Sequence, residues 1–167
     1  MTHPLTVIVM GVSGCGKSTL AGAIAGHLSW PFVEGDDYHS PANRRKMASG
    51  QPLDDSDRRG WIAELTGAIR AAGPVSVVAC SALNPVVRSW IESGIGHAPL
   101  YLLLDGDRDL LTERLKQRTG HFMNPALLDS QLAALRPPED AVIVPVDLPQ
   151  KAQLSLALEF IRQRMSR

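Results

Sequence analysis

The sequence predicts an α/β fold, a parallel sheet with helices on both faces, and three observations favour it. Short runs that are apolar at every residue alternate with segments of amphipathic helical spacing, which is typical of strands buried on both faces. A glycine-rich loop directly follows the first apolar run, as in a strand, loop and helix unit. At 167 residues, the chain has the length of one domain with a sizeable core.

The elements are expected to alternate regularly along the chain. Apolar runs predict strands, and apolar residues at three- and four-residue intervals predict the helices between them. The predicted strands are residues 5–10, 32–34, 75–80, 100–104 and 142–144. The predicted helices are residues 17–28, 58–71, 85–93, 110–118, 125–135 and 152–165. Right-handed crossovers then bring the carboxyl ends of the strands to one edge of the sheet, where ligands bind.

Composition and charge exclude several classes of protein. The 17 basic and 17 acidic residues give a formal net charge of zero, which does not favour a nucleic-acid or anionic-membrane surface. No apolar stretch approaches the roughly 20 residues that cross a bilayer, and the first ten residues lack the basic start and cleavage site of a secretory leader. Cys15 and Cys80 are too few for a disulfide scaffold. We therefore expect one cytoplasmic domain over residues 1–167, with reduced thiols.

Residues 11–19 read GVSGCGKST, the complete GxxxxGK[ST] pattern of a phosphate loop. Its glycines let successive N–H groups point into one concavity, which faces the positive end of the following helix. Lys17 is expected to reach the β- and γ-phosphates, and the Ser18 hydroxyl to bind Mg²⁺. A chance glycine turn is the alternative, but strand, loop and helix are all in register. The expected nucleotide-binding residues of this loop are Gly11, Val12, Ser13, Gly14, Cys15, Gly16, Lys17, Ser18 and Thr19.

Two polar stretches interrupt the alternation, at residues 35–57 and 118–124. Both are expected to overhang the phosphate loop, the first as an acceptor-binding insertion and the second as a lid. The first begins in an acidic turn with Glu34, Asp36 and Asp37 at the end of a predicted strand. Carboxylates there can hold the waters of Mg²⁺ and accept a hydrogen bond from a substrate hydroxyl. A solvated acidic turn is the alternative.

Cationic side chains follow in the same polar region. Arg58 can grip a carboxylate with two hydrogen bonds, and Lys46 can supply a point charge, which suits a small anion that carries hydroxyl groups. The alternative is a capped helix with Asp57 as N-cap and Arg58 on its solvated face, and the spacing alone does not decide. Ser81 follows the third predicted strand and is expected to line the same pocket.

Arg114 and Arg118 are spaced i and i+4, so a helix places both guanidinium groups on one face. At the mouth of the site, one can stack on adenine while the other neutralises charge on the transferred phosphoryl group. A solvated arginine pair is the alternative, but the aromatic and glycine residues that follow favour the functional interpretation. His121, in the expected lid, is either a packed residue or a substrate contact.

Taken together, these motifs resemble the gluconate kinases (gluconokinases), small P-loop kinases related to shikimate and adenylate kinases. The matching segments are residues 10–19, 34–39, 43–47, 50–53, 57–58 with Trp61, 80–83, 114–122 and 130–131. The resemblance implies a three-layer P-loop kinase fold with a five-stranded parallel sheet and a short lid. It also implies Mg²⁺- and ATP-dependent phosphorylation of D-gluconate at its 6-hydroxyl, giving 6-phosphogluconate and ADP, by a cytoplasmic homodimer without nucleic-acid or membrane partners.

The resemblance also implies roles for individual residues. Asp36 would lie nearest the acceptor hydroxyl, and Glu34 would bind Mg²⁺ through water. Arg114 would lie against adenine, with Asp147 in the loop on the other side of the base. The expected catalytic residues are Lys17, Asp36 and Arg118. The expected substrate contacts are Asp36, His39, Lys46, Arg58, Ser81, Arg88 and His121.

The sequence departs from the family pattern at three places. Asn84-Pro85 stands where a basic pair is usual, so that a basic contact is either missing or supplied by Arg88. Gly60 replaces a proline, and Arg136 replaces an acidic residue. Two other functions stay open at this point, a small-molecule kinase for shikimate or a nucleoside monophosphate, and a nucleotide-binding switch without an acceptor. The crowded polar residues at 34–58 favour an acceptor pocket over a switch.

Overall fold

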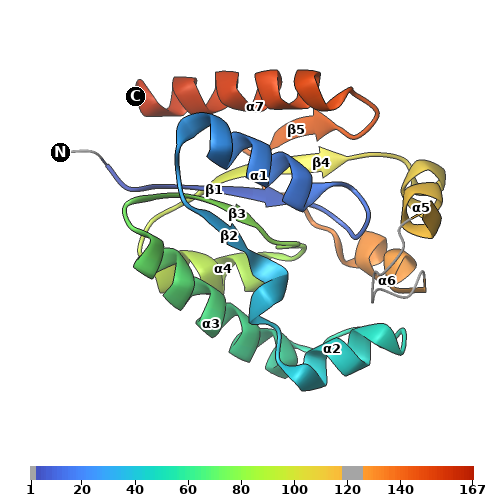
Figure 1. The fold of residues 1–167 in the computed structure, drawn as a ribbon. Helices are drawn as coiled ribbons and strands as arrows, with labels where there is room; N and C mark the ends of the chain where they lie inside the picture. The colour runs from blue at the N-terminus through green and yellow to red at the C-terminus, as the bar shows by residue number, and fades with distance from the viewer. Residues whose placement is uncertain (1–2, 118–125) are drawn as a thin grey trace.

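The computed structural model describes residues 3–117 and 126–167, and Figure 1 shows its fold. The strands are β1 (Leu5–Met10), β2 (Phe32–Glu34), β3 (Val75–Ala79), β4 (Leu100–Asp105) and β5 (Val142–Pro145). The helices are α1 (Lys17–Leu28), α2 (Pro41–Ala48), α3 (Asp55–Ala72), α4 (Pro85–Ile95), α5 (Arg108–Gln117), α6 (Ala126–Ala134) and α7 (Gln150–Met165), with the short 3-10 helix η1 (Gly35–Tyr38). In the part of the chain so described, no helix is long and apolar enough to span a bilayer.

The strands form one five-stranded sheet in the order β2-β3-β1-β4-β5, and every pair is parallel. Helices cover both faces, with α1 and α7 on one side and α3 and α4 on the other (Figure 1). Alternate residues of β1 point into the two layers, Val7 and Val9 into the first core and Ile8 and Met10 into the second. The expected α/β class and five-stranded parallel sheet are confirmed.

The predicted boundaries agree best at the start of the chain. β1, β2 and α1 have the expected limits, and β3, β4 and β5 each differ by one residue at the carboxyl end. Within the polar stretch 35–57, for which no helix was predicted, the structure has η1 and α2. Ser40 caps α2 by accepting a hydrogen bond from the Asn43 N–H at 3.0 Å, and Pro41 occupies the first turn.

The start of α3 also differs from expectation. The helix begins at Asp55, three residues earlier than predicted, and its N-cap is Asp54. Asp54 accepts the Asp57 N–H at 2.8 Å, while Asp57 accepts the Asp54 N–H at 3.0 Å. This reciprocal capping box places Asp57 inside the first turn, and not at the N-cap position.

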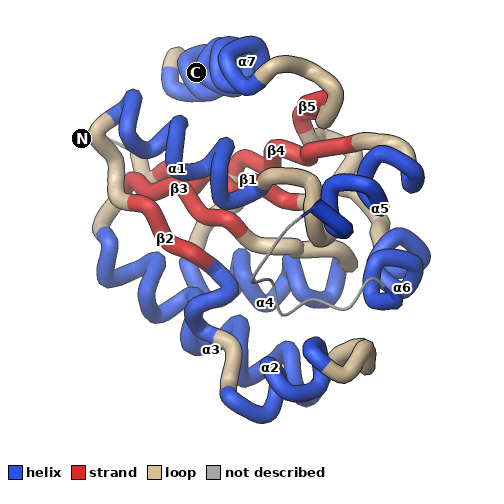
Figure 2. Tube along the Cα trace, turned by 45° about the vertical axis from the view of Figure 1, so that its right-hand side comes forward, coloured by secondary structure: helices blue, strands red, loops and turns tan. Residues whose placement is uncertain are grey.

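The carboxyl ends of the parallel strands meet at one edge of the sheet, which positions the candidate site. β1 lies between β3 and β4, so the loop after β1 is flanked by the turn after β3. The Gly11 N–H donates to the Ser81 carbonyl across that boundary at 3.4 Å. Helices α5 and α6 lie side by side at this edge in Figures 1 and 2. The glycine loop, the acidic turn and α6 therefore surround one region.

Candidate active site at the carboxyl edge of the sheet

The loop between β1 and α1 requires glycine for backbone conformation and for space. Gly11, Gly14 and Gly16 have φ angles of +145°, +82° and +99°, which side chains disfavour. A Cβ on Gly11 would lie 2.8 Å from Cys15 Sγ and 2.9 Å from the Leu104 carbonyl oxygen. Buried Val12 and Cys15 side chains anchor the loop in the core beside α1. The backbone is thus fixed in the curled form that exposes N–H groups.

Two polar side chains at the start of α1 point toward the loop and the acidic turn. Lys17 Nζ donates to the Val12 carbonyl at 3.0 Å, across the loop. The Ser18 hydroxyl donates to the Glu34 carboxylate, which also accepts the Asp36 N–H at 3.4 Å. The two residues expected at the Mg²⁺ site are therefore in contact, and a hydroxyl beside a carboxylate is a donor set that fits Mg²⁺. Within residues 3–117 and 126–167, no cluster of three His, Cys, Asp or Glu side chains could hold a metal by itself.

One pocket joins the phosphate loop to the acidic turn. Its polar lining residues are Ser13, Lys17, Asp36, His39, Arg58, Ser81, Ser130 and Gln131. Its apolar lining residues include Met47, Leu53, Trp61 and Leu127. Residues from the loop, η1, α2, α3, the turn after β3 and α6 therefore converge on one cavity. Six of the residues expected from the sequence are among them: Ser13, Lys17, Asp36, His39, Arg58 and Ser81.

His39 forms a neutral wall of this pocket. Its ring stacks on Trp61, with ring centroids 4.1 Å apart, and the Trp61 indole N–H donates to the Gly35 carbonyl at 2.8 Å. Its Nε2 lies 3.8 Å from Asp36 Oδ1. Burial lowers the pKa of His39 to about 4 despite the attraction of Asp36. The ring is therefore uncharged at neutral pH and can offer hydrogen bonds to a hydroxyl group.

The turn that carries Asp36 packs tightly against the neighbouring strand. A Cβ on Gly35 would collide with the carbonyl oxygen of Ala79 in β3, so only glycine allows η1 to approach the sheet this closely. Arg44 of α2 donates to the Asp36 carbonyl at 3.0 Å. The acidic turn therefore packs against β3 on one side and is hydrogen-bonded to α2 on the other.

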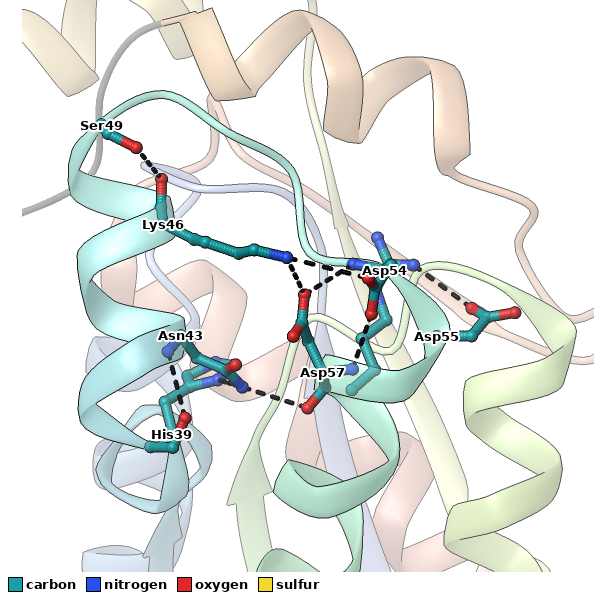
Figure 3. Close-up of polar contacts among 9 residues, drawn as sticks. His39, Asn43, Lys46, Ser49, Asp54, Asp55 and Asp57 are labelled. Carbon is teal, nitrogen blue, oxygen red and sulfur yellow. Dashed lines mark hydrogen bonds and ion pairs between the residues drawn. The ribbon is translucent and has the colours of Figure 1, made fainter.

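Lys46 lies outside the residues that line the pocket and instead joins α2 to α3. Figure 3 shows its ammonium group beside Asp57, at 2.6 Å, and near Asp54, at 3.7 Å. Asn43 Nδ2 donates to the Asp57 carbonyl at 3.1 Å. The hydrogen bond between Lys46 and Asp57 raises the pKa of the amine and lowers the pKa of the carboxyl. These contacts fasten α2 to the first turn of the helix that carries Arg58.

Arg88 also lies outside the pocket lining. Its buried guanidinium donates to the carbonyl of Ala82 at 2.8 Å and to that of Arg136. Ala82 has a φ of +45°, a strained conformation for a residue with a side chain. The Arg136 N–H donates to the Leu83 carbonyl at 2.8 Å. Arg88 therefore supports the turn that presents Ser81 and Leu83 to the pocket.

Two of the three departures from the family pattern have local structural roles. Asn84 caps α4 by accepting the Val87 N–H at 2.9 Å, and Pro85 follows at the first helical position. The Arg136 guanidinium donates to the carbonyls of Ala133 and Leu135, both at 2.9 Å, just beyond the last turn of α6. The carbonyl groups at the carboxyl end of α6 therefore favour a cation at position 136.

A second pocket lies on the other side of the phosphate loop. It is lined by Gly14, Cys15, Gly16, Thr19, Arg114, Gln117, Leu148, Gln150 and Gln153. Arg114 donates to the Val146 carbonyl at 3.0 Å, and Gln153 donates to the same oxygen at 3.2 Å. The expected adenine-side partners, Arg114 and the loop that contains Asp147, are thus brought together. Arg118, His121 and the expected lid at 118–124 lie outside the described residues.

Sequence reasoning assigned no role to some pocket residues. Gln131 of α6 accepts the Ser13 N–H at 2.7 Å, and Trp61 supports His39 and Gly35. Ser130-Gln131 and Trp61 were within the segments that carry the family resemblance, but nothing in their spacing indicated a function. Their convergence depends on how α3 and α6 pack, which a local pattern does not reveal.

Comparisons with known proteins place this geometry in a family. The Shikimate kinase family model matches residues 13–137. The Gluconokinase of Gluconobacter oxydans (strain 621H) is 45% identical over 142 residues, covering 82% of this chain and 78% of the relative. The Probable gluconokinase of Mus musculus is 41% identical over 169 residues, covering 88% and 92%. The crystal structure of a gluconokinase from Sinorhizobium meliloti 1021 superposes with a TM-score of 0.87 at 37% identity, covering 99% of this chain and 96% of that one.

Proposed function

The chain belongs to the gluconokinase family within the P-loop kinases, and from this premise we propose that it phosphorylates D-gluconate. The γ-phosphoryl group of ATP passes to the 6-hydroxyl, giving 6-phosphogluconate and ADP. The observation that carries the proposal is one pocket in which Lys17 of the phosphate loop shares the lining with Asp36, His39 and Arg58. A donor site and a site for a hydroxylated carboxylic acid therefore meet at one edge of the sheet.

The residues on the donor side are proposed to act by position and charge. Phosphoryl transfer needs little covalent help, so alignment and neutralisation of charge supply most of the catalysis. Lys17 exchanges its contact with the Val12 carbonyl for the phosphates. Ser18 and Glu34 would hold Mg²⁺, Glu34 through water, and the bound ion supplies neutralisation of the phosphate charge. Arg118 is proposed to act on the same phosphates, and Arg114 with the loop of Asp147 to hold the base.

The residues on the acceptor side are proposed to recognise an acid that carries hydroxyl groups. Arg58 binds the carboxylate, because a guanidinium can donate two parallel hydrogen bonds to it. Asp36 orients the reacting hydroxyl and accepts its proton. Neutral His39 and the Ser81 hydroxyl contact the other hydroxyl groups, and His121 is proposed as a further contact of the substrate. Lys46 and Arg88 are proposed to act through the segments that they hold.

The domain organisation, the localisation, the oligomeric state and the metal requirement complete the proposal. The acceptor-binding insertion covers residues 35–57 and the lid residues 118–124, within a single domain over residues 1–167. By likeness to the family, we propose a cytoplasmic homodimer that requires Mg²⁺. Sedimentation of the purified chain tests the assembly, and activity after treatment with EDTA, with and without added Mg²⁺, tests the metal.

The acceptor is tested by an assay that couples ADP release to an optical signal. ADP release is measured with ATP and Mg²⁺ over gluconate, shikimate, AMP and no acceptor. We expect release that depends on gluconate and saturates with it. Release stimulated only by shikimate or AMP would assign a different small-molecule kinase. Release that is independent of any acceptor, or no release, would favour a nucleotide-binding switch.

A further inference from the structure

A hydrogen bond links the phosphate loop to a helix on the acceptor side. The side-chain oxygen of Gln131, in α6, accepts the backbone N–H of Ser13 at 2.7 Å. The two residues are 118 positions apart in the sequence, so the contact is set by the fold. Backbone N–H groups of this loop are the donors that hold phosphate. A side chain that engages one of them therefore lies at the reaction centre.

Ser13 marks the boundary between the two pockets. It lines the pocket that contains Asp36 and Arg58, whereas the next residues, Gly14 to Gly16, line the pocket that contains Arg114. Gln131 lines the acceptor pocket as well. The hydrogen bond therefore lies at the junction of the two pockets, where the proposed function has the phosphoryl group pass from donor to acceptor.

Helix α6 is fixed at both ends to elements of the two pockets. Arg108 of α5 forms two hydrogen bonds to the Asp129 carboxylate, at 2.7 and 3.1 Å, and α5 also carries Arg114. Beyond the other end of α6, the Arg136 N–H donates to the Leu83 carbonyl at 2.8 Å, in the turn that presents Ser81. A displacement of α6 would therefore change its contacts with α5, which carries Arg114, and with the turn that presents Ser81.

We propose that Gln131 is a positioning residue that couples acceptor binding to nucleotide binding. The inference rests on the proposed function and names a device within the same site. A gluconate molecule bound against Ser130 and Ala134 of α6 fixes that helix, and Gln131 then holds the Ser13 end of the phosphate loop in the form that aligns the phosphoryl group. Occupancy of one pocket thereby favours occupancy of the other.

The test is the affinity for gluconate with and without a non-hydrolysable Mg²⁺–ATP analogue, measured by calorimetry. In the wild type, we expect the analogue to tighten gluconate binding about 5-fold or more. Gln131→Met removes the accepting oxygen at similar length. We expect the ratio to fall to about 2-fold or less and kcat to fall about 10- to 100-fold, while each ligand alone binds within about 3-fold of wild type.

Gln163→Met is the matched control, because Gln163 is an exposed glutamine of α7 whose amide donates to Glu159. It should leave both the ratio and kcat unchanged. Gln131→Asn is the second variant, since it keeps a carboxamide but withdraws its oxygen by about 1.5 Å. It should show the same loss of coupling, and it carries the test if Gln131→Met does not fold.

Three results would overturn the inference. The first is a ratio and a kcat that do not change in the Gln131 variants. The second is weaker binding of each ligand alone, which would indicate a merely structural role. The third is a wild type that binds both ligands without coupling. A wild type that phosphorylates no gluconate would instead contradict the proposed function, so the two failures are distinguishable.

Discussion

The two halves of the site are built in different ways. The phosphate loop is one continuous segment after β1, and its shape is set by glycine φ angles and by two buried side chains, Val12 and Cys15. The acceptor pocket is assembled from the acidic turn, α2, α3, the turn after β3 and α6. Its polar groups are held by contacts between segments, such as those of Lys46 and Arg88. Donor binding therefore depends mainly on local backbone geometry, to which α6 adds the contact of Gln131 with Ser13. Acceptor binding depends throughout on tertiary contacts between segments.

The largest effect is expected on the donor side. Lys17→Ala removes the ammonium group that would neutralise the transferred phosphoryl group, so kcat should fall about 10²- to 10⁴-fold. The measurement is ADP release at saturating gluconate and ATP. Lys116→Ala is the control, because Lys116 is an exposed lysine of α5 that lines neither pocket. A loss smaller than about 3-fold in Lys17→Ala would remove this residue from the catalytic group.

The next effect is expected on the acceptor side alone. Arg58→Ala should raise KM for gluconate about 10- to 100-fold, since a hydrogen bond to a charged group contributes about 1.5–3 kcal/mol. KM for ATP should change little. Arg59→Ala is the matched variant, because Arg59 is exposed and lies over the Trp90 ring, 5.2 Å from its centroid. An unchanged KM for gluconate in Arg58→Ala would show that the carboxylate is bound elsewhere.

A smaller effect should follow when the contact between α2 and α3 is broken. Lys46→Met leaves the Asp57 carboxylate without its ammonium partner, so α2 loosens and KM for gluconate should rise about 3- to 10-fold. Asp57→Asn should give a similar rise. The double variant should be no worse than either single one, because both remove the same interaction. Additive effects would mean that Lys46 contacts the substrate directly.

The sequence predicts these two halves unequally well, and the reason is physical. Loop 11–19 and its flanking elements follow from adjacent residues, and their expected limits agree with the structure. Helix α2 was not predicted from the sequence, because it buries only Asn43 and therefore has no apolar periodicity. The role of Gln131 was not predicted for a different reason, because its partner Ser13 is distant in the chain. Residue types were predictable here, but the partners of long polar side chains were not.

The pH dependence of the free energy of unfolding tests whether His39 is buried as a neutral ring in the acceptor pocket. Its pKa is about 4 in the folded protein and 6.5 in the unfolded chain. Between these values the unfolded chain binds more protons, so the free energy of unfolding should fall as the pH is lowered from 6.5 toward 4. Urea titrations at pH 7, 6 and 5 measure the slope. His39→Gln should flatten it, whereas His27→Gln, at an exposed position of α1, should not. A slope that is equal in wild type and His39→Gln would contradict the burial of a neutral ring.

Two glycines, Gly60 of α3 and Gly35 of η1, should respond to alanine with effects of opposite sign. Gly60 lies inside α3 with open space around its Cβ position, so Gly60→Ala should raise the free energy of unfolding by about 0.5–1 kcal/mol. Gly35→Ala should lower it, because the new Cβ would meet the Ala79 carbonyl. Thermal unfolding of both variants gives the signs. Destabilisation by Gly60→Ala would mean that α3 is not regular at that point.

The central claim is that donor and acceptor pockets form one reaction centre for the terminal hydroxyl of gluconate. The most direct measurement is a proton-coupled ³¹P NMR spectrum of the product formed from ATP, Mg²⁺ and gluconate. Phosphate on the terminal carbon couples to the two protons of a methylene group, and this is the predicted result. Phosphate coupled to a single carbon-bound proton, or inorganic phosphate alone, would contradict the account.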